Sequence, residues 1–421
     1  MSASPTFTEA TRVWARIGCL SFGGPAGQIA LMHREIVEER KWLTEQQYLS
    51  ALNFCMLLPG PEAMQLATYA GWRLHGVKGG LAAGLLFVAP GAVVVLALSM
   101  LYGAFGNLPW IAAIFYGVKA AVLAIVIEAL LRVARRALKA NTDWIIAGAA
   151  FLALYCFDVP FPLIIIAAGI LGYIRSSKAP HVPSATRPTF KSLFSTTLVW
   201  GLVWLVPLAA LIATLGSDHV LSKIGIFFSQ LAIVTFGGAY AVLAYMAQAA
   251  VEQYNWLSPP EMIDGLALAE TTPGPLILVT QFVGYLAASR EMGSVWGGLA
   301  GAAITLWMTF APCFLWIFAG APYIEHIGKL PRLSGALAAI TAAVVGVILN
   351  LSVWFGLHVL FGKVNRLQGV FQPWLPDWQT IDIAALLISV IAALALLRFH
   401  FSIPKTLGFC AILGLIWKLG F

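Results

Sequence analysis

Long apolar stretches alternate with short polar connections along the chain, and this pattern predicts a bundle of membrane-spanning helices. Five stretches run for more than 20 residues without Asp, Glu, Lys or Arg, at 79–104, 193–215, 225–250, 295–320 and 333–357. A helix of about 20 apolar residues crosses the roughly 30 Å of hydrocarbon in a bilayer. Such runs indicate helices rather than the short alternating strands of a membrane barrel.

Other apolar stretches are shorter, charged or broken. Residues 110–131 contain Lys119 and Glu128, whereas 7–32 and 47–72 are interrupted by Gly-Gly-Pro and Pro-Gly-Pro. Four short runs form two predicted hairpins, 144–157 with 161–174 and 383–397 with 404–420. Together the pattern predicts an all-α polytopic membrane protein with about 13 transmembrane helices.

The composition supports a membrane protein and argues against other classes. With 60% hydrophobic and 10% charged residues, and a mean hydropathy of +0.86, the apolar surface exceeds what one soluble core can bury. The net charge of +7 does not indicate nucleic-acid binding, because the basic residues stand at the edges of spans. The five cysteines are dispersed, and we find no metal site, cofactor motif or catalytic signature that would indicate an enzyme. A cleavable signal peptide is not evident either, since glycine and proline interrupt the first apolar segment.

The second half of the chain repeats the first. A shift of 214 residues (235 − 21 = 214) places "SFGGPAGQIALM", from Ser21, on "TFGGAYAVLAYM", from Thr235, and Pro-Gly-Pro at 59–61 on Pro-Gly-Pro at 273–275. Between 17 and 61, 13 of 45 positions are identical, and the helix breakers keep their spacing. The sequence therefore predicts a tandem duplication of a repeat with about six spans.

The duplication predicts three segments: an N-terminal repeat at 1–174, a basic linker with a connecting span at 175–222, and a C-terminal repeat at 223–421. An even number of spans returns the chain to its starting side, and one extra span moves it across. The second repeat should therefore be inverted relative to the first. Basic residues of the first repeat fall on one side, which predicts a cytoplasmic N-terminus, but those of the second repeat fall on both sides.

The interruptions share one polarity. Pro25, Pro61 and Pro275 stand where a first helical residue would stand, because proline has a suitable φ and no amide hydrogen to satisfy. Each break should leave free N–H groups in a glycine turn, pointing to the space before the half-helix. Such an arrangement can bind an anion. With a further helix start near residue 239, four such ends could converge near the midplane, as in transporters with inverted repeats. Close helix packing at Gly-Gly pairs is the alternative explanation.

These motifs also resemble a known family. The segment "SFGGP", the following Trp-Leu at 42–43 and "PGPEAMQLA" at 59–67, which precedes a Gly-Gly span, closely resemble the chromate ion transporter family. "TFGGAYAVLAYM" and "TTPGP" are similar to the C-terminal repeat of its long, two-domain members. The resemblance covers nearly the whole chain. It implies a secondary transporter that exports chromate across the bacterial inner membrane and confers chromate resistance, with sulfate or another tetrahedral oxyanion as the alternative substrate and an anion channel as a weaker alternative.

The predicted substrate site combines glycine turns with polar side chains near the breaks and two cations. Glycine leaves room and N–H groups, hydroxyl and amide groups can donate to a tetrahedral oxyanion, and cations inside spans are default functional candidates. The predicted residues are Ser21, Gly23, Gly24, Gln28, Gly60, Gln65, Thr235, Gly237, Gly238, Thr272, Gly274 and Gln281, with Lys119 as the main counter-charge and Arg16 as the second. Hydrogen bonds between packed helices explain the polar side chains equally well, and Arg16 could instead reach the membrane interface.

Three acidic residues are candidates for carrying a coupled proton. Glu62 follows the first Pro-Gly-Pro, Glu270 precedes the second, and Glu128 shares a span with Lys119. Glu62 could instead complement the dipole of the half-helix that it begins. The predicted partners are the oxyanion, the lipid bilayer and, as an option, a second copy of the chain.

Overall fold

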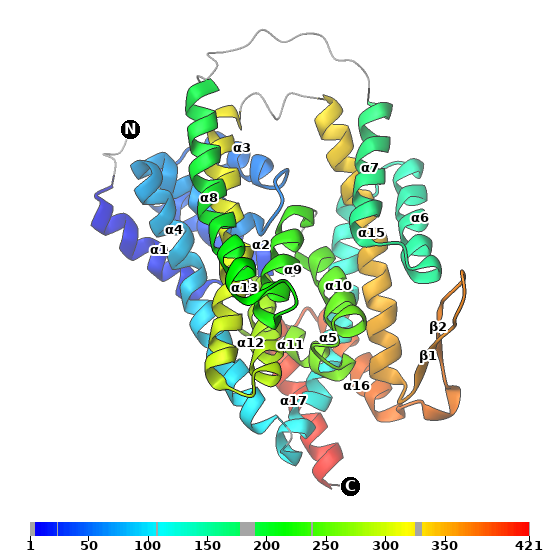
Figure 1. Cartoon of the computed structure of the whole chain (residues 1–421). Helices are drawn as coiled ribbons and strands as arrows, with labels where there is room; N and C mark the ends of the chain where they lie inside the picture. Colours follow the sequence, from blue (N-terminus) through cyan, green and yellow to red (C-terminus); the bar gives the residue numbers. More distant parts are fainter. Residues whose placement is uncertain are drawn as a thin grey trace. The chain divides into compact units, whose positions relative to one another are not determined.

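The fold is described from a computed structural model, which describes residues 5–22, 24–106, 108–176, 190–236, 239–324 and 331–420 (Figure 1). Helices dominate these residues. In chain order the elements are α1 (Phe7–Leu20), α2 (Gly24–His33), η1 (Arg34–Glu39), α3 (Glu45–Cys55), α4 (Glu62–Phe105), α5 (Pro109–Ala137), α6 (Asn141–Phe157), α7 (Phe161–Arg175), α8 (Phe190–Leu215), α9 (Val220–Val234), α10 (Ala239–Gln248), η2 (Ala249–Gln253), α11 (Pro259–Thr271), η3 (Leu276–Leu278), α12 (Val279–Glu291), α13 (Val295–Gly320), η4 (Ala321–Tyr323), α15 (Pro331–Leu360), β1 (Val364–Arg366), β2 (Trp374–Pro376), η5 (Trp378–Thr380), α16 (Ile383–Ala393), η6 (Leu394–Arg398) and α17 (Ile403–Gly420).

Six helices of the described part are long and apolar enough to cross a membrane: α4, α5, α8 from Leu193, α13 with η4, α15 and α17. The shorter apolar helices α6, α7, α9 and α16 with η6 accompany them. The predicted class, a helical multi-pass membrane protein, is confirmed. The number of about 13 spans and the inversion of the second repeat stay predictions.

The structure differs from the predicted spans in three places. The apolar run at 225–250 is not one helix, because α9 ends at Val234 and α10 begins at Ala239. Residues 62–105 form α4 with non-helical backbone at His75 and Gly76, which separates the predicted spans. The strands β1 and β2 pair as a small antiparallel hairpin that the hydrophobic pattern did not reveal, because its segments are too short to show alternation.

The chain forms two compact units that each draw on both halves of the sequence. Unit 1 comprises 1–100, 177–239 and 272–334. Unit 2 comprises 101–176, 240–271 and 335–421. The predicted division at 174 and 222 concerns the repeats and stays a prediction, whereas the compact units interleave the two halves.

In unit 1, α12 and α13 lie side by side, and α9 and α8 pack against α13 (Figure 1). Small residues make the α12–α13 contact close. A Cβ added at Gly301 would stand 2.3 Å from the carbonyl oxygen of Gly284, and one at Gly284 would stand 2.0 Å from Oγ1 of Thr305. Helices in a membrane gain most from such backbone approach, because lipid leaves no hydrophobic driving force between them.

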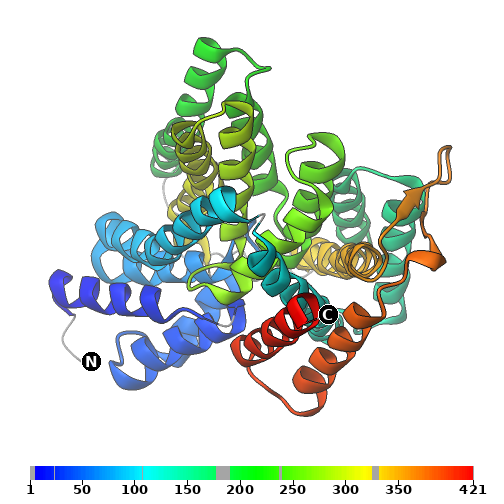
Figure 2. The same ribbon diagram turned by 90° about the horizontal axis from the view of Figure 1, so that it is seen from below.

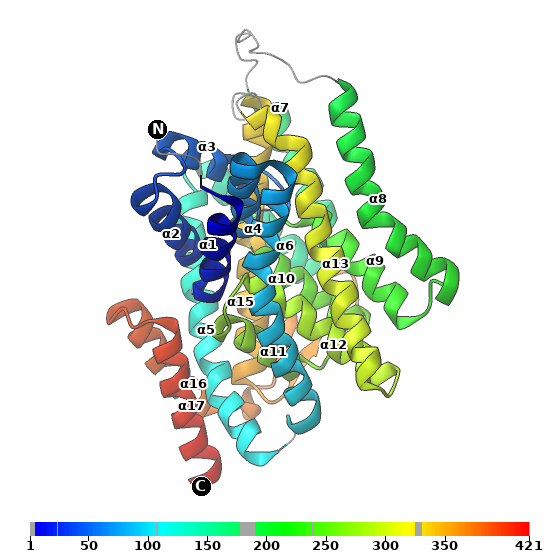
Figure 3. The same cartoon turned by 90° about the vertical axis from the view of Figure 1, so that its left-hand side faces the viewer.

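In unit 2, α5 packs against α11, α16 and α17. Figures 2 and 3 show α16 and α17 as neighbouring helices that run beside α5. A Cβ at Gly117 would stand 1.8 Å from the carbonyl oxygen of Cys410, and one at Gly414 would stand 2.5 Å from the carbonyl oxygen of Ala113. The contact between α5 and α17 therefore depends on glycine, and it fixes the part of α5 that carries Lys119.

One arginine anchors the β-hairpin within unit 2. Arg366 on β1 lies 2.8 Å from Oδ1 of Asp158 and 2.7 Å from Oε2 of Glu252, and its guanidinium is 5.3 Å from the ring of Trp374. Burial raises the pKa of Glu252 to about 7, and the charge of Arg366 opposes that shift. The hairpin is thereby tied to the end of η2 and to the turn between α6 and α7.

The backbone repeats as well as the sequence. Residues with positive φ occur at matching places in the two halves. Two of the three π-helical segments in the described residues, η1 and η2, each follow the second helix of their half. The matched residues and their φ angles are Lys41 (55°) with Asn255 (51°), Gly60 (118°) with Gly274 (93°), Gly76 (62°) with Gly293 (59°), and Asp158 (52°) with His400 (53°). Left-handed backbone is costly for residues other than glycine, so its recurrence supports the duplication independently of side-chain identity.

A pair of glycine substitutions separates backbone strain from packing. Gly60 and Gly76 both have positive φ, so alanine should strain the backbone at each by about 1–3 kcal/mol. A Cβ at Gly60 would also lie 2.7 Å from Nε2 of Gln65 and 2.9 Å from Sγ of Cys313, whereas one at Gly76 meets nothing within 4 Å. Gly60→Ala should therefore lower the thermal unfolding temperature in detergent more than Gly76→Ala. Equal shifts would show that the Gly60 turn is not tightly packed.

Candidate functional site

The two Pro-Gly-Pro breaks are bonded to the opposite half of the chain in unit 1. The amide of Gly60 donates to the carbonyl oxygen of Thr235 at 2.8 Å, and the amide of Gly274 donates to the carbonyl oxygen of Ser21 at 2.8 Å. Both pairs obey the shift of 214 residues, since 274 − 60 and 235 − 21 are each 214. Reciprocal contacts of this kind arise when two equivalent bodies are related by a two-fold axis.

The breaks begin helices close to the predicted residues. α2 begins at Gly24, α4 at Glu62, α10 at Ala239, and η3 at Leu276, directly after Pro275. The predicted half-helix starts are thus confirmed to within one residue. The first turn of each helix has N–H groups without an intrahelical acceptor.

Each Pro-Gly-Pro turn also packs on a proline-containing helix from the other half. A Cβ at Gly274 would lie 3.2 Å from Cα of Gly91 on α4, and one at Gly60 would lie 2.9 Å from Sγ of Cys313 on α13. Gly91 follows Pro90 and Cys313 follows Pro312. The packing is reciprocal like the hydrogen bonds, and it gives Pro90 and Pro312 equivalent places in the two halves.

Two glutamines line these turns. Nε2 of Gln28 donates to the carbonyl oxygen of Gly274 at 2.7 Å, and Nε2 of Gln65 donates to the carbonyl oxygen of Pro59 at 2.6 Å. Gln28, Gln65 and Gln281 are all at most 1% exposed. The second half has Val242 at the position equivalent to Gln28. The polar side chains beside the two Pro-Gly-Pro turns therefore differ between the two halves of the chain.

Several groups that the sequence interpretation left free for an anion are bonded within the protein. The amides of Gly60 and Gly274 serve the opposite half, as described above. The hydroxyl of Ser21 donates to the carbonyl oxygen of Ile17 at 2.7 Å, and that of Thr235 donates to the carbonyl oxygen of Leu231. A hydroxyl has only one proton to donate. Nε2 of Gln28 also donates to the carbonyl oxygen of Ser21 at 3.5 Å. In this arrangement the available donors are the first-turn amides of the half-helices.

The remaining predictions in unit 1 have mixed outcomes. Gly23, Gly237 and Gly238 lie outside the described residues. Thr272 is buried at 6% exposure, close to the second break. Arg16 is 3.7 Å from Oε1 of the buried Glu35, whose other oxygen is 2.6 Å from Arg40. Arg16 is thus part of an ion-pair network, and its role as a substrate counter-charge stays a prediction with a structural alternative.

The predicted counter-charge Lys119 has an acidic partner in unit 2. Its Nζ lies 3.2 Å from Oδ1 of Asp264 on α11, and the hydroxyl of Tyr102 donates to Oδ2 of the same carboxylate at 2.6 Å. Asp264 is only 4% exposed. The sequence interpretation missed Asp264, although a carboxylate among the apolar residues of 262–269 was a detectable signal.

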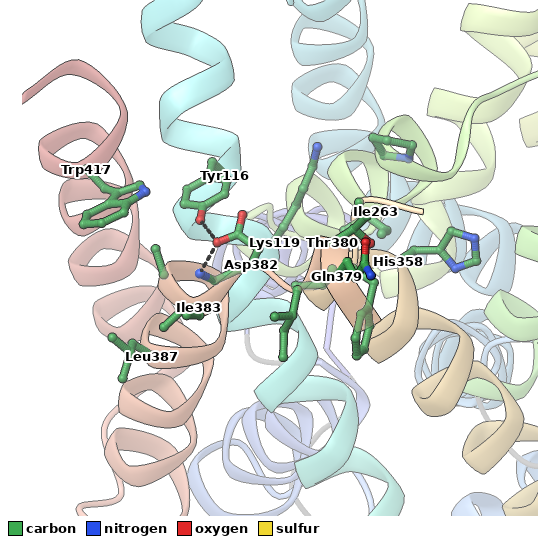
Figure 4. A pocket seen from close by; sticks show the side chains of 17 residues that line it. Tyr116, Lys119, Ile263, His358, Gln379, Thr380, Asp382, Ile383, Leu387 and Trp417 are labelled. Atoms are coloured by element: carbon green, nitrogen blue, oxygen red, sulfur yellow. Dashed lines mark hydrogen bonds between the residues drawn. The ribbon is translucent and has the colours of Figure 1, made fainter. Parts of the chain in front are cut away.

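Lys119 also lines a cavity of about 770 Å³ in unit 2 (Figure 4). In this view, Lys119 extends from α5 between Tyr116 and His358, and the Tyr116 hydroxyl bonds to Asp382 at 2.6 Å. The polar side chains of Gln379 and Thr380 also line the cavity. The cavity thus presents one cation and several hydrogen-bonding groups within otherwise apolar walls.

The three predicted proton carriers occupy different settings. Glu62 begins α4 in unit 1. In unit 2, Glu270 accepts a hydrogen bond from the hydroxyl of Tyr240 at 2.8 Å, and Glu128 pairs with Arg132 one turn further along α5. The structure does not bring the three together in one unit, and each role stays a prediction.

Comparison with known proteins identifies the family of this chain. The model of the family described as "Chromate transporter" matches residues 8–173 and 222–415. The chain belongs to the chromate transporter family. It is therefore a transporter and not an enzyme, and the two matched segments agree with the duplicated motifs. The earlier resemblance is confirmed over most of the chain.

Three relatives extend this membership of the chromate transporter family. A chromate transport protein of Cupriavidus metallidurans is 30% identical over 425 residues, which are 98% of this chain and 94% of the relative. A probable chromate transport protein of Synechococcus elongatus is 30% identical over 90% of this chain and 94% of its own length. A chromate transport protein of Pseudomonas aeruginosa is 32% identical over 79% of this chain and 77% of its own length. No solved structure matches the chain.

Substitution of Gln28 tests how much its hydrogen bond to Gly274 stabilises the contact between the two halves of the chain. In Gln28→Val the buried carbonyl of Gly274 loses its side-chain donor, which should cost about 1–3 kcal/mol of unfolding free energy. Gln28→Glu should cost more, because an ionised carboxylate has no proton to donate and would face carbonyl oxygens. Thermal unfolding of both purified variants in detergent measures the effect. Wild-type stability in both variants would show that the hydrogen bond between Gln28 and Gly274 does not stabilise this contact.

Proposed function

We propose that this protein is a secondary transporter that exports chromate from the cytoplasm across the bacterial inner membrane and so confers chromate resistance. Its membership of the chromate transporter family and its long matches to chromate transport proteins support the substrate. The observation that carries a carrier mechanism is the reciprocal bonding of the two breaks, Gly60 with Thr235 and Gly274 with Ser21. Broken helices that meet across a pseudo-two-fold axis are the arrangement in which many secondary transporters bind substrate.

The inversion of the second repeat belongs to this proposal. The connecting helix α8 separates the two repeats and has no counterpart in the helix order of either. If it crosses the membrane once, the second repeat enters from the side opposite to the first. The reciprocal bonds support a two-fold relation, and alternating access would follow from motion of one repeat against the other.

The electrical driving force is sufficient for export. At an interior-negative potential of 100 mV, each negative charge that moves outward releases about 2.3 kcal/mol, so a dianion releases about 4.6 kcal/mol. Since about 1.4 kcal/mol corresponds to a factor of ten, this could hold a gradient of roughly a thousandfold. Export therefore needs no second ion in principle.

Transport by inside-out vesicles tests the proposal. Potassium outside and valinomycin in the membrane make the lumen positive without a pH gradient, and this potential should drive labelled chromate into the vesicles. Labelled sulfate in parallel vesicles decides between the two oxyanions. Saturation at high chromate concentration supports a carrier, whereas a flux that stays proportional to concentration supports a channel. Uptake driven only by a pH gradient would overturn potential-driven export and favour Glu62 and Glu270 as proton carriers.

Cysteine labelling in intact cells tests the topology. In a background without the native cysteines, a single cysteine in the linker at 175–191 should be protected from an impermeant thiol reagent. A cysteine at Ser217, an exposed position between α8 and α9, should react, because α8 carries the chain across the membrane. Labelling of both positions from the same side would contradict the inversion of the second repeat.

A further inference from the structure

The two side chains of the ion pair between Lys119 and Asp264 differ in their exposure. The side chain of Lys119 is 22% exposed and that of Asp264 is 6% exposed. Lys119 lines the cavity of unit 2, and Asp264 is not among the residues that form its wall. An anion in the cavity can therefore reach the ammonium group of Lys119, while the carboxylate lies behind it.

The cavity has room for a hydrated oxyanion. Its volume of about 770 Å³ is many times the roughly 30 Å³ that one water molecule occupies in the liquid. Polar groups from three elements face it, including the hydroxyl of Thr380, the amide of Gln379 and the imidazole of His358. Lys119 is the cationic side chain among the lining residues. An oxyanion that entered here would be attracted to Lys119.

A single lysine cannot neutralise both a carboxylate and an oxyanion. While Asp264 is ionised, the pair with Lys119 has no net charge and offers a dianion little attraction. A dianion that binds Lys119 places further negative charge beside the buried carboxylate, and nearby negative charge favours the protonated form of a carboxyl group. A protonated Asp264 can keep the hydrogen bond from Tyr102, because its carbonyl oxygen still accepts.

The surrounding charged groups do not replace Lys119 as the partner for which Asp264 and an oxyanion would compete. Asp382, an aspartate in the cavity wall, accepts hydrogen bonds from the amide of Ala385 at 2.9 Å, at the N-terminus of α16, and from the hydroxyl of Tyr116 at 2.6 Å. The titratable groups beside the pair are Tyr102, which donates to Asp264, and Glu261 on the same helix. Tyr116, His358 and Asp382 line the cavity together with Lys119, and Lys418 lies over the ring of Tyr116. Glu261 lies within one helical turn of Asp264 on α11, and its negative charge acts on Asp264 in the same sense as a bound anion would.

We propose that Asp264 is the proton-coupling residue of this transporter: it holds Lys119 while ionised and takes up a proton when an oxyanion in the cavity binds Lys119. The proposal rests on the proposed transport function and goes beyond it by assigning the coupled ion and its site. The proton comes from water on the side where the oxyanion enters. It returns to water on the other side, where the oxyanion leaves and the pair forms again. One proton then accompanies each dianion, so the exported charge is one negative charge instead of two.

Other acidic residues lack this arrangement. Glu270 is bonded to Tyr240, and Glu128 pairs with Arg132. Asp158 is an aspartate of the same unit that pairs with a cation, Arg366, at 2.8 Å, and it is not among the residues that line the cavity. It is therefore a matched control.

Binding of labelled chromate to the purified full-length protein provides the test, at several values between pH 6 and pH 8.5. The apparent Kd of the wild type should rise with pH, by up to tenfold per unit, because each oxyanion that binds takes up one proton. Asp264→Asn mimics the protonated carboxyl, so its Kd should be low and should lose this dependence. Asp158→Asn should keep the wild-type dependence. Chromate itself titrates equally in every sample, so the ratio of variant to wild-type Kd reports on the protein alone.

Proton movement gives an independent readout. In proteoliposomes with the potential clamped by valinomycin, chromate entry should acidify the lumen in the wild type and in Asp158→Asn, but not in Asp264→Asn. Tyr102→Phe removes one hydrogen bond without removing the carboxyl group. It should shift the pH dependence and keep the proton movement, which covers the case in which Asp264→Asn fails to fold.

The outcomes separate the two proposals. Wild-type pH dependence and proton movement in folded Asp264→Asn would overturn the role of Asp264 and leave the transport function intact. Loss of chromate binding in folded Asp264→Asn would also overturn it, because the protonated mimic should bind. A wild-type protein that neither binds nor transports chromate or sulfate would instead overturn the proposed function.

Discussion

The fold of unit 1 depends on two hydrogen bonds between backbone groups of opposite halves. A helix that breaks inside an apolar environment leaves N–H and C=O groups without partners, and each unpaired group costs several kcal/mol there. The amides of Gly60 and Gly274 find their acceptors at Thr235 and Ser21. Each half therefore satisfies the break of the other. Neither break would be satisfied in this way by its own half alone.

Glycine makes this reciprocal contact possible for two separate reasons. Gly60 and Gly274 have φ angles of 118° and 93°, which a residue with a Cβ rarely adopts. Their lack of a side chain also lets Gly91 and Cys313 approach. The same property operates in unit 2, where Gly117 and Gly414 bring α5 and α17 together. In both units, small residues decide which helices meet and therefore where the polar groups lie.

The charged residues inside the helices follow one rule. Lys119 pairs with Asp264, Glu128 with Arg132 and Glu35 with two arginines. A lone buried charge is expensive, so a stable arrangement provides a partner. A transporter has to exchange such a partner for its substrate. This makes Lys119, which faces the cavity of unit 2, different from the arginines near Glu35.

The sequence by itself determined the helical membrane class, most helix boundaries, the duplication and the places where helices break. These features are local or periodic: apolar runs set the spans, proline and glycine set the breaks, and a constant shift reveals the repeat. Gln28 and Lys119 could be named as polar residues in apolar surroundings for the same reason. The partners of these groups could not be named. Only the tertiary structure shows that the amide of Gly60 meets Thr235 and that Lys119 meets Asp264, because each pair joins residues more than 140 positions apart (235 − 60 = 175, 264 − 119 = 145). Hydrophobic periodicity says which face of a helix is buried, but the close approach of backbones at glycine decides which helix lies against it.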